Sequence, residues 1–330
     1  MLTPVAPPYA QYRKNVSRMG WSMLLFIGVF YVSNFISATV EMLVDLATSA
    51  TMSGVLTALY GVLSSVCYMA PFFVAGLFYY RLSRHEPVQR VSFEVKLSRE
   101  FPLWIFAGMA CLTAAAYINS WFCSAIGYTI PEELLLAESY DDPAAVILYM
   151  TVALAPAFAE EFLFRGVFYT NLRPFGRTQA VILSSLLFAL MHQNIGRLFY
   201  TFVGGIAMAL MYEKTGSIWC SVFFHMFNNE MSVIYELLYY REGGEAMGVY
   251  ITLLEAVLFL IGVVSMVILV VFHRKDRATS RAMERYDASI PSSLAVRGAL
   301  CPGMVVFTAV TVGLMLLTWL SLVLVNGGVL

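Results

Sequence analysis

Three apolar segments of this sequence contain ionisable or amide side chains, which are rare inside membrane-spanning stretches and usually mark a functional site there. Carboxylates and imidazoles are the side chains that most often move protons during hydrolysis. An amide beside an imidazole can supply hydrogen bonds to a developing oxyanion. The set comprises Glu160, Glu161 and Arg165 in the first segment, His192 at the end of the second, and His225 and Asn229 in the third.

Glu160 is the residue of this set best placed to activate water. Glu161 precedes Arg165 by four residues, an order and spacing that favour an ion pair on one face of a helix, so we predict a structural pair between them. Glu160 is rotated by about 100° from Glu161 around a helix and cannot use Arg165 equally. We therefore expect Glu160 to accept a proton from water as a general base.

The histidines can assist that chemistry. His192 can orient the water or donate a proton to the leaving amine, because imidazole changes its protonation close to neutral pH. Asn229 lies one helical turn after His225, so both can direct donors at one oxyanion. The structural alternative is that these side chains only form hydrogen bonds between helices. The combination of the three segments favours catalysis.

Composition indicates a membrane protein. Apolar residues make up 60% of the 330 residues and charged residues only 12%, whereas soluble domains are about one quarter charged. The net charge of −1 provides no basic surface for nucleic acid, so that class of partner is excluded. The five cysteines lack the close paired spacing of a zinc site or a disulfide framework.

The apolar segments predict an all-α, polytopic transmembrane helix bundle with eight to nine spans, because crossing a hydrocarbon core of ~30 Å takes about 20 apolar residues. No internal repeat or linker divides the chain, so we expect a single membrane domain over 1–330, with a core at 144–240 and flanking spans at 20–127 and 248–326. The candidate spans are 20–40, 52–80, 101–127, 144–170, 178–193, 198–213, 217–240, 248–272 and 301–326.

The distribution of positive charge predicts a cytoplasmic N-terminus. With that orientation, the inner segments hold seventeen of the twenty Lys and Arg residues, as cytoplasmic loops usually do. A rise of 1.5 Å per residue then places Glu160, His192 and His225 roughly 17, 21 and 12 Å from the cytoplasmic ends of their helices. Three separate helices thus deliver an acid and two imidazoles to the middle of the bilayer.

The polar residues fall into three short motifs that follow one another along the chain. In this order and on separate membrane helices, they resemble the signature motifs of the CAAX prenyl protease and bacteriocin-processing family of intramembrane endopeptidases, over roughly 144–240. Any one of the motifs is weak alone, and together they are specific. The motifs read Glu160-Glu161-x3-Arg165, Phe188-x3-His192 and His225-x3-Asn229.

The resemblance implies an α-helical membrane endopeptidase and assigns roles to the motif residues. Glu160 would activate water with help from His192, and His225 and Asn229 would form the oxyanion hole. Glu161 and Arg165 would support the site. The substrate implied is a membrane-anchored peptide or protein in the lipid bilayer, with a prenylated CAAX-type protein as one form. The expected location is the bacterial cytoplasmic membrane, and the alternative is the endoplasmic reticulum.

We expect catalysis without a metal, because the sequence has no His-Glu-x-x-His helix that would bring zinc ligands together. The alternative is zinc bound through Glu160, His192 and His225.

Other functions remain as alternatives. A proton-coupled transporter would use Glu160, His192 and Glu255 as a relay, although no internal repeat supports it. A non-catalytic bacteriocin self-immunity protein would keep the fold without turnover. A serine protease would need a dyad of Ser221 and His225, which lacks a third positioned group.

Overall fold

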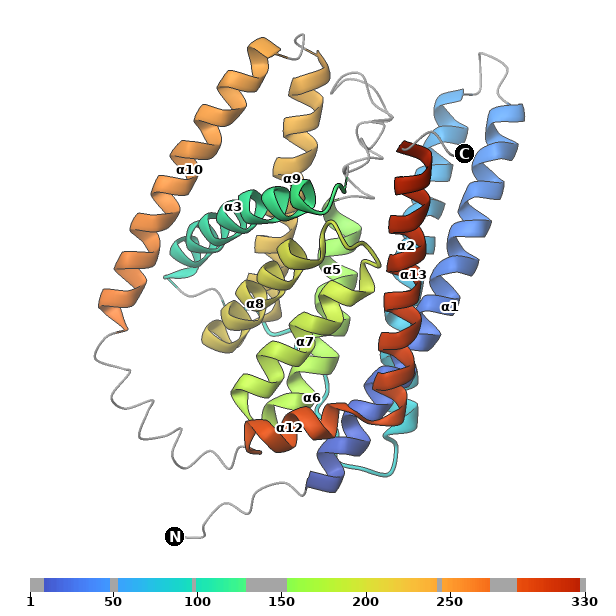
Figure 1. Cartoon of the computed structure of the whole chain (residues 1–330), viewed down its shortest axis with the longest axis vertical. Helices are drawn as coiled ribbons and strands as arrows, with labels where there is room; N and C mark the ends of the chain where they lie inside the picture. Colours follow the sequence, from blue (N-terminus) through green and yellow to red (C-terminus); the bar gives the residue numbers. More distant parts are fainter. Residues whose placement is uncertain are drawn as a thin grey trace.

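The structure is a computed structural model, and it describes residues 9–47, 53–96, 99–128, 153–241, 245–273 and 290–326. Within these ranges all regular structure is helical and no strand is present, which confirms the all-α prediction (Figure 1). Each of the nine predicted apolar segments coincides with helix, although residues 144–152 of the fourth lie outside the described ranges.

The helices follow the apolar segments closely. In chain order they are α1 Tyr9–Ala47, α2 Ser53–Leu82, α3 Phe101–Ala125, α5 Ala155–Glu161, the π-helix η2 Phe162–Tyr169, α6 Thr170–Leu172, the 3-10 turn η3 Arg173–Phe175, α7 Arg177–Met191, α8 Leu198–Thr215, α9 Ile218–Arg241, α10 Glu245–Phe272, α12 Ser292–Ala299 and α13 Pro302–Asn326.

Within the described ranges, five helices are long and apolar enough to cross a membrane. Many of their large apolar side chains are exposed, which suits contact with lipid. The chain is therefore a multi-pass membrane protein, while the total number of spans and the cytoplasmic N-terminus stay predictions. The five stretches are Tyr9–Val44, Leu59–Leu82, Phe101–Ala125, Gly248–Phe272 and Pro302–Leu324.

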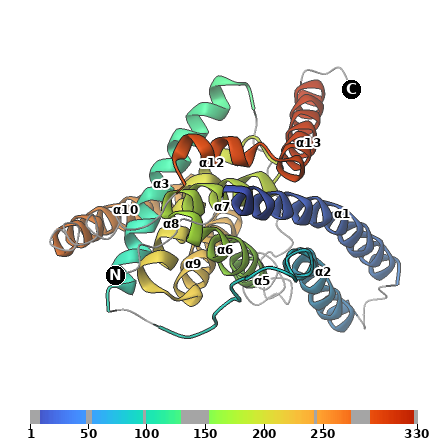
Figure 2. The same cartoon turned by 90° about the horizontal axis from the view of Figure 1, so that it is seen from below.

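Small residues allow two pairs of helices to pack closely. A Cβ on Gly20 of α1 would lie 2.2 Å from the backbone of Gly303 in α13, and a Cβ on Gly262 of α10 would lie 2.3 Å from the Phe106 carbonyl of α3. Such contacts between glycines and backbone are a common way for membrane helices to associate. They place α1, α2 and α13 on one side of the molecule and α3 with α10 on the other (Figures 1 and 2).

The helices α5 to α9 lie between these two groups and form the most buried part of the molecule. Phe164 and Phe168 of η2 are fully buried and pack edge to face, with ring centroids 5.9 Å apart. The ring of Phe188 from α7 contacts Phe164 at 5.3 Å. Aromatic packing around η2 therefore fixes the helix that follows the two adjacent glutamates.

The segment between α2 and α3 forms hydrogen bonds with residues of two other parts of the bundle. Asn171 of α6 accepts a hydrogen bond from the Gln89 backbone amide at 2.9 Å and donates to its carbonyl at 3.0 Å. The hydroxyl of Ser217, just before α9, donates to the Glu94 carbonyl at 3.1 Å. One irregular segment thus links two helices of the central group.

One helix lies inside a segment that the sequence predicts to be a loop. The eight-residue helix α12 begins after Pro291 and lies across the base of the molecule (Figure 1). Its Gly298 leaves room for the ring of Tyr12, whose hydroxyl donates to the Ala295 carbonyl at 3.3 Å. Packing against α1, which has no local signal in the sequence, explains this helix.

Candidate active site

The two glutamates stand at a change of helical geometry. Glu160 and Glu161 end α5, and the next eight residues form the π-helix η2. The hydroxyl of Thr170 donates to the Arg165 carbonyl at 2.9 Å, across the five-residue spacing of a π-helix. Short π-helical insertions within helices occur frequently at functional sites.

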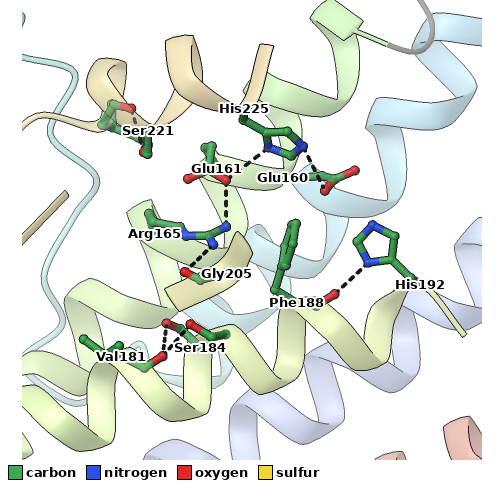
Figure 3. Close-up of polar contacts among 12 residues, drawn as sticks. Glu160, Glu161, Arg165, Val181, Ser184, Phe188, His192, Gly205, Ser221 and His225 are labelled. Atoms are coloured by element: carbon green, nitrogen blue, oxygen red, sulfur yellow. Dashed lines mark hydrogen bonds and ion pairs between the residues drawn. The ribbon is translucent and has the colours of Figure 1, made fainter. Parts of the chain in front are cut away.

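The predicted ion pair between Glu161 and Arg165 is present. Nη1 of Arg165 donates to Oε1 of Glu161 at 2.6 Å, and both side chains have an exposed fraction of 0%. Nη2 of Arg165 donates to the Gly205 carbonyl of α8 at 2.9 Å, and the guanidinium lies 4.7 Å from the ring centroid of Phe188 on α7. Arg165 therefore ties η2 to two neighbouring helices (Figure 3).

Glu160 is almost completely buried, with 2% of its surface exposed. One carboxylate oxygen, Oε1, accepts a hydrogen bond from the hydroxyl of Tyr68 on α2. The other, Oε2, has no hydrogen-bond partner among the described residues and lies 3.9 Å from Nε2 of His225. That distance exceeds a direct hydrogen bond and suits two groups that share a water molecule.

His225 of α9 lies between the two carboxylates. Its Nδ1 is 3.3 Å from Oε1 of Glu161, while Nε2 faces Glu160 (Figure 3). Oε1 of Glu161 also accepts a hydrogen bond from Arg165, so one carboxylate oxygen orients both the guanidinium and the imidazole. The Glu161–Arg165 pair thereby sets the position of the ring that faces Glu160.

His192 directly follows α7. Its Nδ1 lies 2.9 Å from the Phe188 carbonyl, so an N–H at Nδ1 would donate to that carbonyl and leave Nε2 able to accept a proton. The Phe188 ring contacts the rings of both histidines, with centroids 5.0 Å from His192 and 5.8 Å from His225. Figure 3 shows this ring between Arg165 and His192.

Asn229 lies one turn after His225 on α9 and is partly buried. Its Oδ1 accepts a hydrogen bond from Nδ2 of Asn228 at 3.3 Å, and Oδ1 of Asn228 accepts one from the Tyr200 hydroxyl of α8 at 2.9 Å. The structure thus links this part of α9 to α8. The role of His225 and Asn229 as an oxyanion hole stays a prediction.

The loop after His192 is held from two other helices. The Gln193 side chain accepts a hydrogen bond from Tyr31 of α1 at 2.8 Å, and its backbone has a positive φ of 50°. From α3, the side-chain amide of Asn119 donates to the Gly196 carbonyl. The hydroxyl of Tyr128, just after α3, donates to the Asn194 side chain at 2.9 Å. These contacts fix the segment that carries His192.

Two alternatives from the sequence receive no geometric support. The Ser221 hydroxyl donates to the Ile218 carbonyl of its own helix at 2.9 Å, and Figure 3 shows it away from the His225 ring. Glu255 of the transporter relay is on α10, a helix that packs mainly against α3.

Metal ligation through the predicted trio does not match the side-chain arrangement. In the described part of the chain, no three His, Cys, Asp or Glu side chains form a group that could hold a metal ion. One oxygen of Glu160 is instead engaged by Tyr68, and the imidazole of His225 is directed at two carboxylates. Catalysis without a metal stays a prediction, and the steps below use only side chains of the protein.

Three contributors to the site were not predicted as such from the sequence. Tyr68 gave only the weak signal of a hydroxyl within an apolar segment, where buried tyrosines usually find a partner. Gly205 contributes a backbone carbonyl, which has no sequence signal. Phe188 belongs to the second motif but was given no catalytic role from the sequence, and its ring packs against both histidines and the guanidinium.

Comparison with known proteins is consistent with this geometry. Residues 142–231 match the family model described as type II CAAX prenyl endopeptidase Rce1-like. No curated protein and no solved structure matches the chain. The fold and the site define a multi-pass helical membrane protein, and the matched segment contains all three motifs. The resemblance predicted from those motifs is confirmed over this segment: residues 142–231 are similar to the Rce1-like CAAX endopeptidases, which supports a membrane protease at the level of the family.

Proposed function

We propose that this protein is an intramembrane endopeptidase that hydrolyses a peptide bond in a membrane-associated protein or peptide, with water activated by Glu160. The observation that carries the proposal is the carboxylate itself. It is buried, one oxygen is held by Tyr68, and the other faces His225 across 3.9 Å without a hydrogen-bond partner in the described residues. A water between them would contact a proton acceptor and an imidazole at once.

In the proposed reaction, Glu160 takes a proton from this water as the water oxygen attacks the carbonyl carbon of the substrate. The new C–O bond converts the carbonyl oxygen into an oxyanion, which His225 and Asn229 stabilise as hydrogen-bond donors. The C–N bond then breaks, and the nitrogen leaves as an amine after receiving a proton from Glu160 or through His192. Glu160 returns to its carboxylate form.

The charges of the cluster suit a base of this kind. Arg165 pairs with Glu161 at 2.6 Å, so these two form a neutral unit. The partner of Glu160 is the uncharged hydroxyl of Tyr68. Glu160 is therefore the carboxylate of the pair that is not held by a cation, while Glu161 is engaged by Arg165 and His225.

The proposed substrate is a membrane-anchored peptide or protein, and the location the bacterial cytoplasmic membrane. This rests on the family match and on the burial of the site within apolar helices. A prenylated CAAX-type protein is the family's substrate class, and the test below distinguishes lipidated from unmodified peptides.

Cleavage of a quenched fluorescent peptide library tests the proposal. Each peptide is prepared with and without a C-terminal isoprenyl cysteine and incubated with detergent-purified wild type or Glu160→Gln, with and without a zinc chelator. We expect cleavage by the wild type that survives chelation and disappears in the variant. Equal cleavage by both proteins would contradict the assignment of Glu160, and loss of wild-type activity on chelation would contradict the metal-free mechanism.

A further inference from the structure

Among the described residues, the hydrogen bond that Glu160 accepts comes from Tyr68, which lies outside the segment matched by the family model. We propose that Tyr68 is a positioning residue for the general base: its hydroxyl holds one oxygen of the Glu160 carboxylate so that the other faces the hydrolytic water. The inference rests on the proposed function, in which Glu160 activates that water.

The two oxygens of Glu160 have different surroundings. Oε1 accepts the Tyr68 hydroxyl, while Oε2 faces Nε2 of His225 at 3.9 Å. A carboxylate without a donor can rotate about its last side-chain bond, because such torsions have broad minima. A donor fixed to one oxygen restricts this rotation and keeps the other oxygen directed at His225.

The position of Tyr68 is itself fixed by packing of α2 against α5 and η2. A Cβ on Gly76 would lie 2.8 Å from the ring of Phe162, so α2 and the start of η2 approach closely at this point. The ring of Phe73 contacts that of Phe162 at 4.9 Å and that of Phe158 at 6.3 Å. Both contacts lie within about two helical turns of Tyr68 along α2.

Contacts with α1 hold α2 from the other side. The ring of Tyr68 packs against Phe72 at 5.5 Å, and Phe72 packs against Phe26 of α1 at 4.8 Å. Phe72 and Phe26 are fully buried, which leaves the phenol little freedom to swing away. The hydroxyl is thus delivered to Glu160 by a helix that is anchored on both faces.

A neutral hydrogen-bond donor such as the Tyr68 hydroxyl suits a general base better than a cationic donor would. A neutral hydroxyl can donate to an ionised carboxylate and stabilise that form without forming an ion pair. The neighbouring Glu161 has the opposite arrangement, with the guanidinium of Arg165 as its partner. The two adjacent carboxylates are thereby divided into a reactive one and a structural one.

Comparison of Tyr68→Phe with Tyr79→Phe tests the inference. Tyr79 is on the same helix, about 16 Å further along, and donates its hydroxyl to the side chain of Asn15 rather than to Glu160. For Tyr68→Phe we expect a roughly 10- to 100-fold lower kcat with KM unchanged.

The control Tyr79→Phe should lose thermal stability but keep the kcat and KM of the wild type. A purely structural role for Tyr68 would make the two variants alike. Equal kcat values for the two variants, or a change in KM instead of kcat in Tyr68→Phe, would therefore overturn the inference.

Infrared spectroscopy tests the contact without turnover. The difference between wild type and Glu160→Gln identifies the carboxylate band of Glu160, and this band should shift in Tyr68→Phe and stay unchanged in Tyr79→Phe. An unshifted band in Tyr68→Phe would show that the hydroxyl does not bind Glu160. A shifted band combined with full cleavage by Glu160→Gln would instead remove the catalytic role of Glu160, which is a failure of the proposed function.

Discussion

At the scale of single residues, Arg165 makes a set of contacts that a simpler cation cannot reproduce together. Its forked guanidinium donates to Glu161 and to the Gly205 carbonyl, and its plane lies against Phe188. A lysine has one flexible point charge in place of this fork. Because the pair is fully buried, removal of one partner leaves an uncompensated charge, which costs about 3–5 kcal/mol.

We therefore predict a strong dependence between these two positions. Glu161→Leu and Arg165→Met should each lower the free energy of unfolding by about 3–5 kcal/mol, whereas the double variant should be more stable than either one. Despite this gain in stability, the double variant should cleave the peptide more slowly than the wild type, because His225 loses the carboxylate that orients Nδ1. Unfolding in detergent measures the stability of the three variants, and cleavage of the best library peptide measures their activity. A loss of stability in the double variant equal to the sum of the two single losses would contradict the coupling.

The sequence was informative where local spacing decides the outcome. The ion pair of Glu161 and Arg165 was predicted from their four-residue spacing, which places both on one face of a helix. The pair is present although the segment after Glu161 is a π-helix. The hydroxyl of Tyr68 could not be assigned to Glu160, because the two positions are 92 residues apart and meet only through packing of α2.

At the scale of helices, the close approach of α7 and α8 brings the Gly205 carbonyl to Arg165. A Cβ at Gly205 would lie 2.9 Å from the Cβ and 3.0 Å from the Cα of Ser185, closer than these atoms can stay. The two helices would have to separate, and the carbonyl would move away from the guanidinium. Helix position and site geometry are therefore coupled at this glycine.

Gly205→Ala should destabilise the protein by about 1–3 kcal/mol and reduce cleavage, since the added methyl overpacks the helix interface. The matched control is Gly313→Ala on α13, where a Cβ would meet no atom within 4 Å. This control should be neutral or more stable by up to about 1 kcal/mol, because alanine favours helix over glycine. Thermal unfolding compares the two, and equal effects would contradict the account of the α7–α8 contact.

A second prediction at this scale concerns the loop that follows His192. Asn119→Ala removes the amide donor to the Gly196 carbonyl and leaves the weaker thiol donor of Cys123 at 3.4 Å, so we expect a cost of about 0.5–1.5 kcal/mol. We expect faster amide hydrogen exchange in residues 193–197 and lower activity, with exchange in α13 unchanged. Unaltered exchange in the loop would show that α3 does not hold it.

At the scale of the whole molecule, composition and apolar length predicted the helical bundle, and the helices of the structure follow those segments. Their order in space depends on small residues such as Gly20 and Gly303, whose contact has no periodic signal in the sequence. The short helix α12 was missed for the same reason, because it is stabilised by Tyr12 of α1 rather than by its own residues.

The predicted orientation can be measured on the intact protein. In a variant without the five native cysteines, Ser92→Cys in the exposed segment between α2 and α3 should react with an impermeant thiol reagent only from the cytoplasmic side. Asp141→Cys, in the segment between the predicted spans 101–127 and 144–170, should react only from outside, because this segment follows the third span and contains no Lys or Arg. The reverse pattern would contradict the cytoplasmic N-terminus.

The assignment of Glu160 as the base is tested most directly by kcat for Glu160→Gln beside that for Glu255→Gln, with the same peptide and with folding of both variants verified by thermal unfolding. Both substitutions replace a carboxylate within an apolar helix by its amide, but only Glu160 lies against Tyr68 and His225. We predict at least a roughly 100-fold loss for Glu160→Gln and near wild-type activity for Glu255→Gln. Retention of cleavage by folded Glu160→Gln would contradict the mechanism.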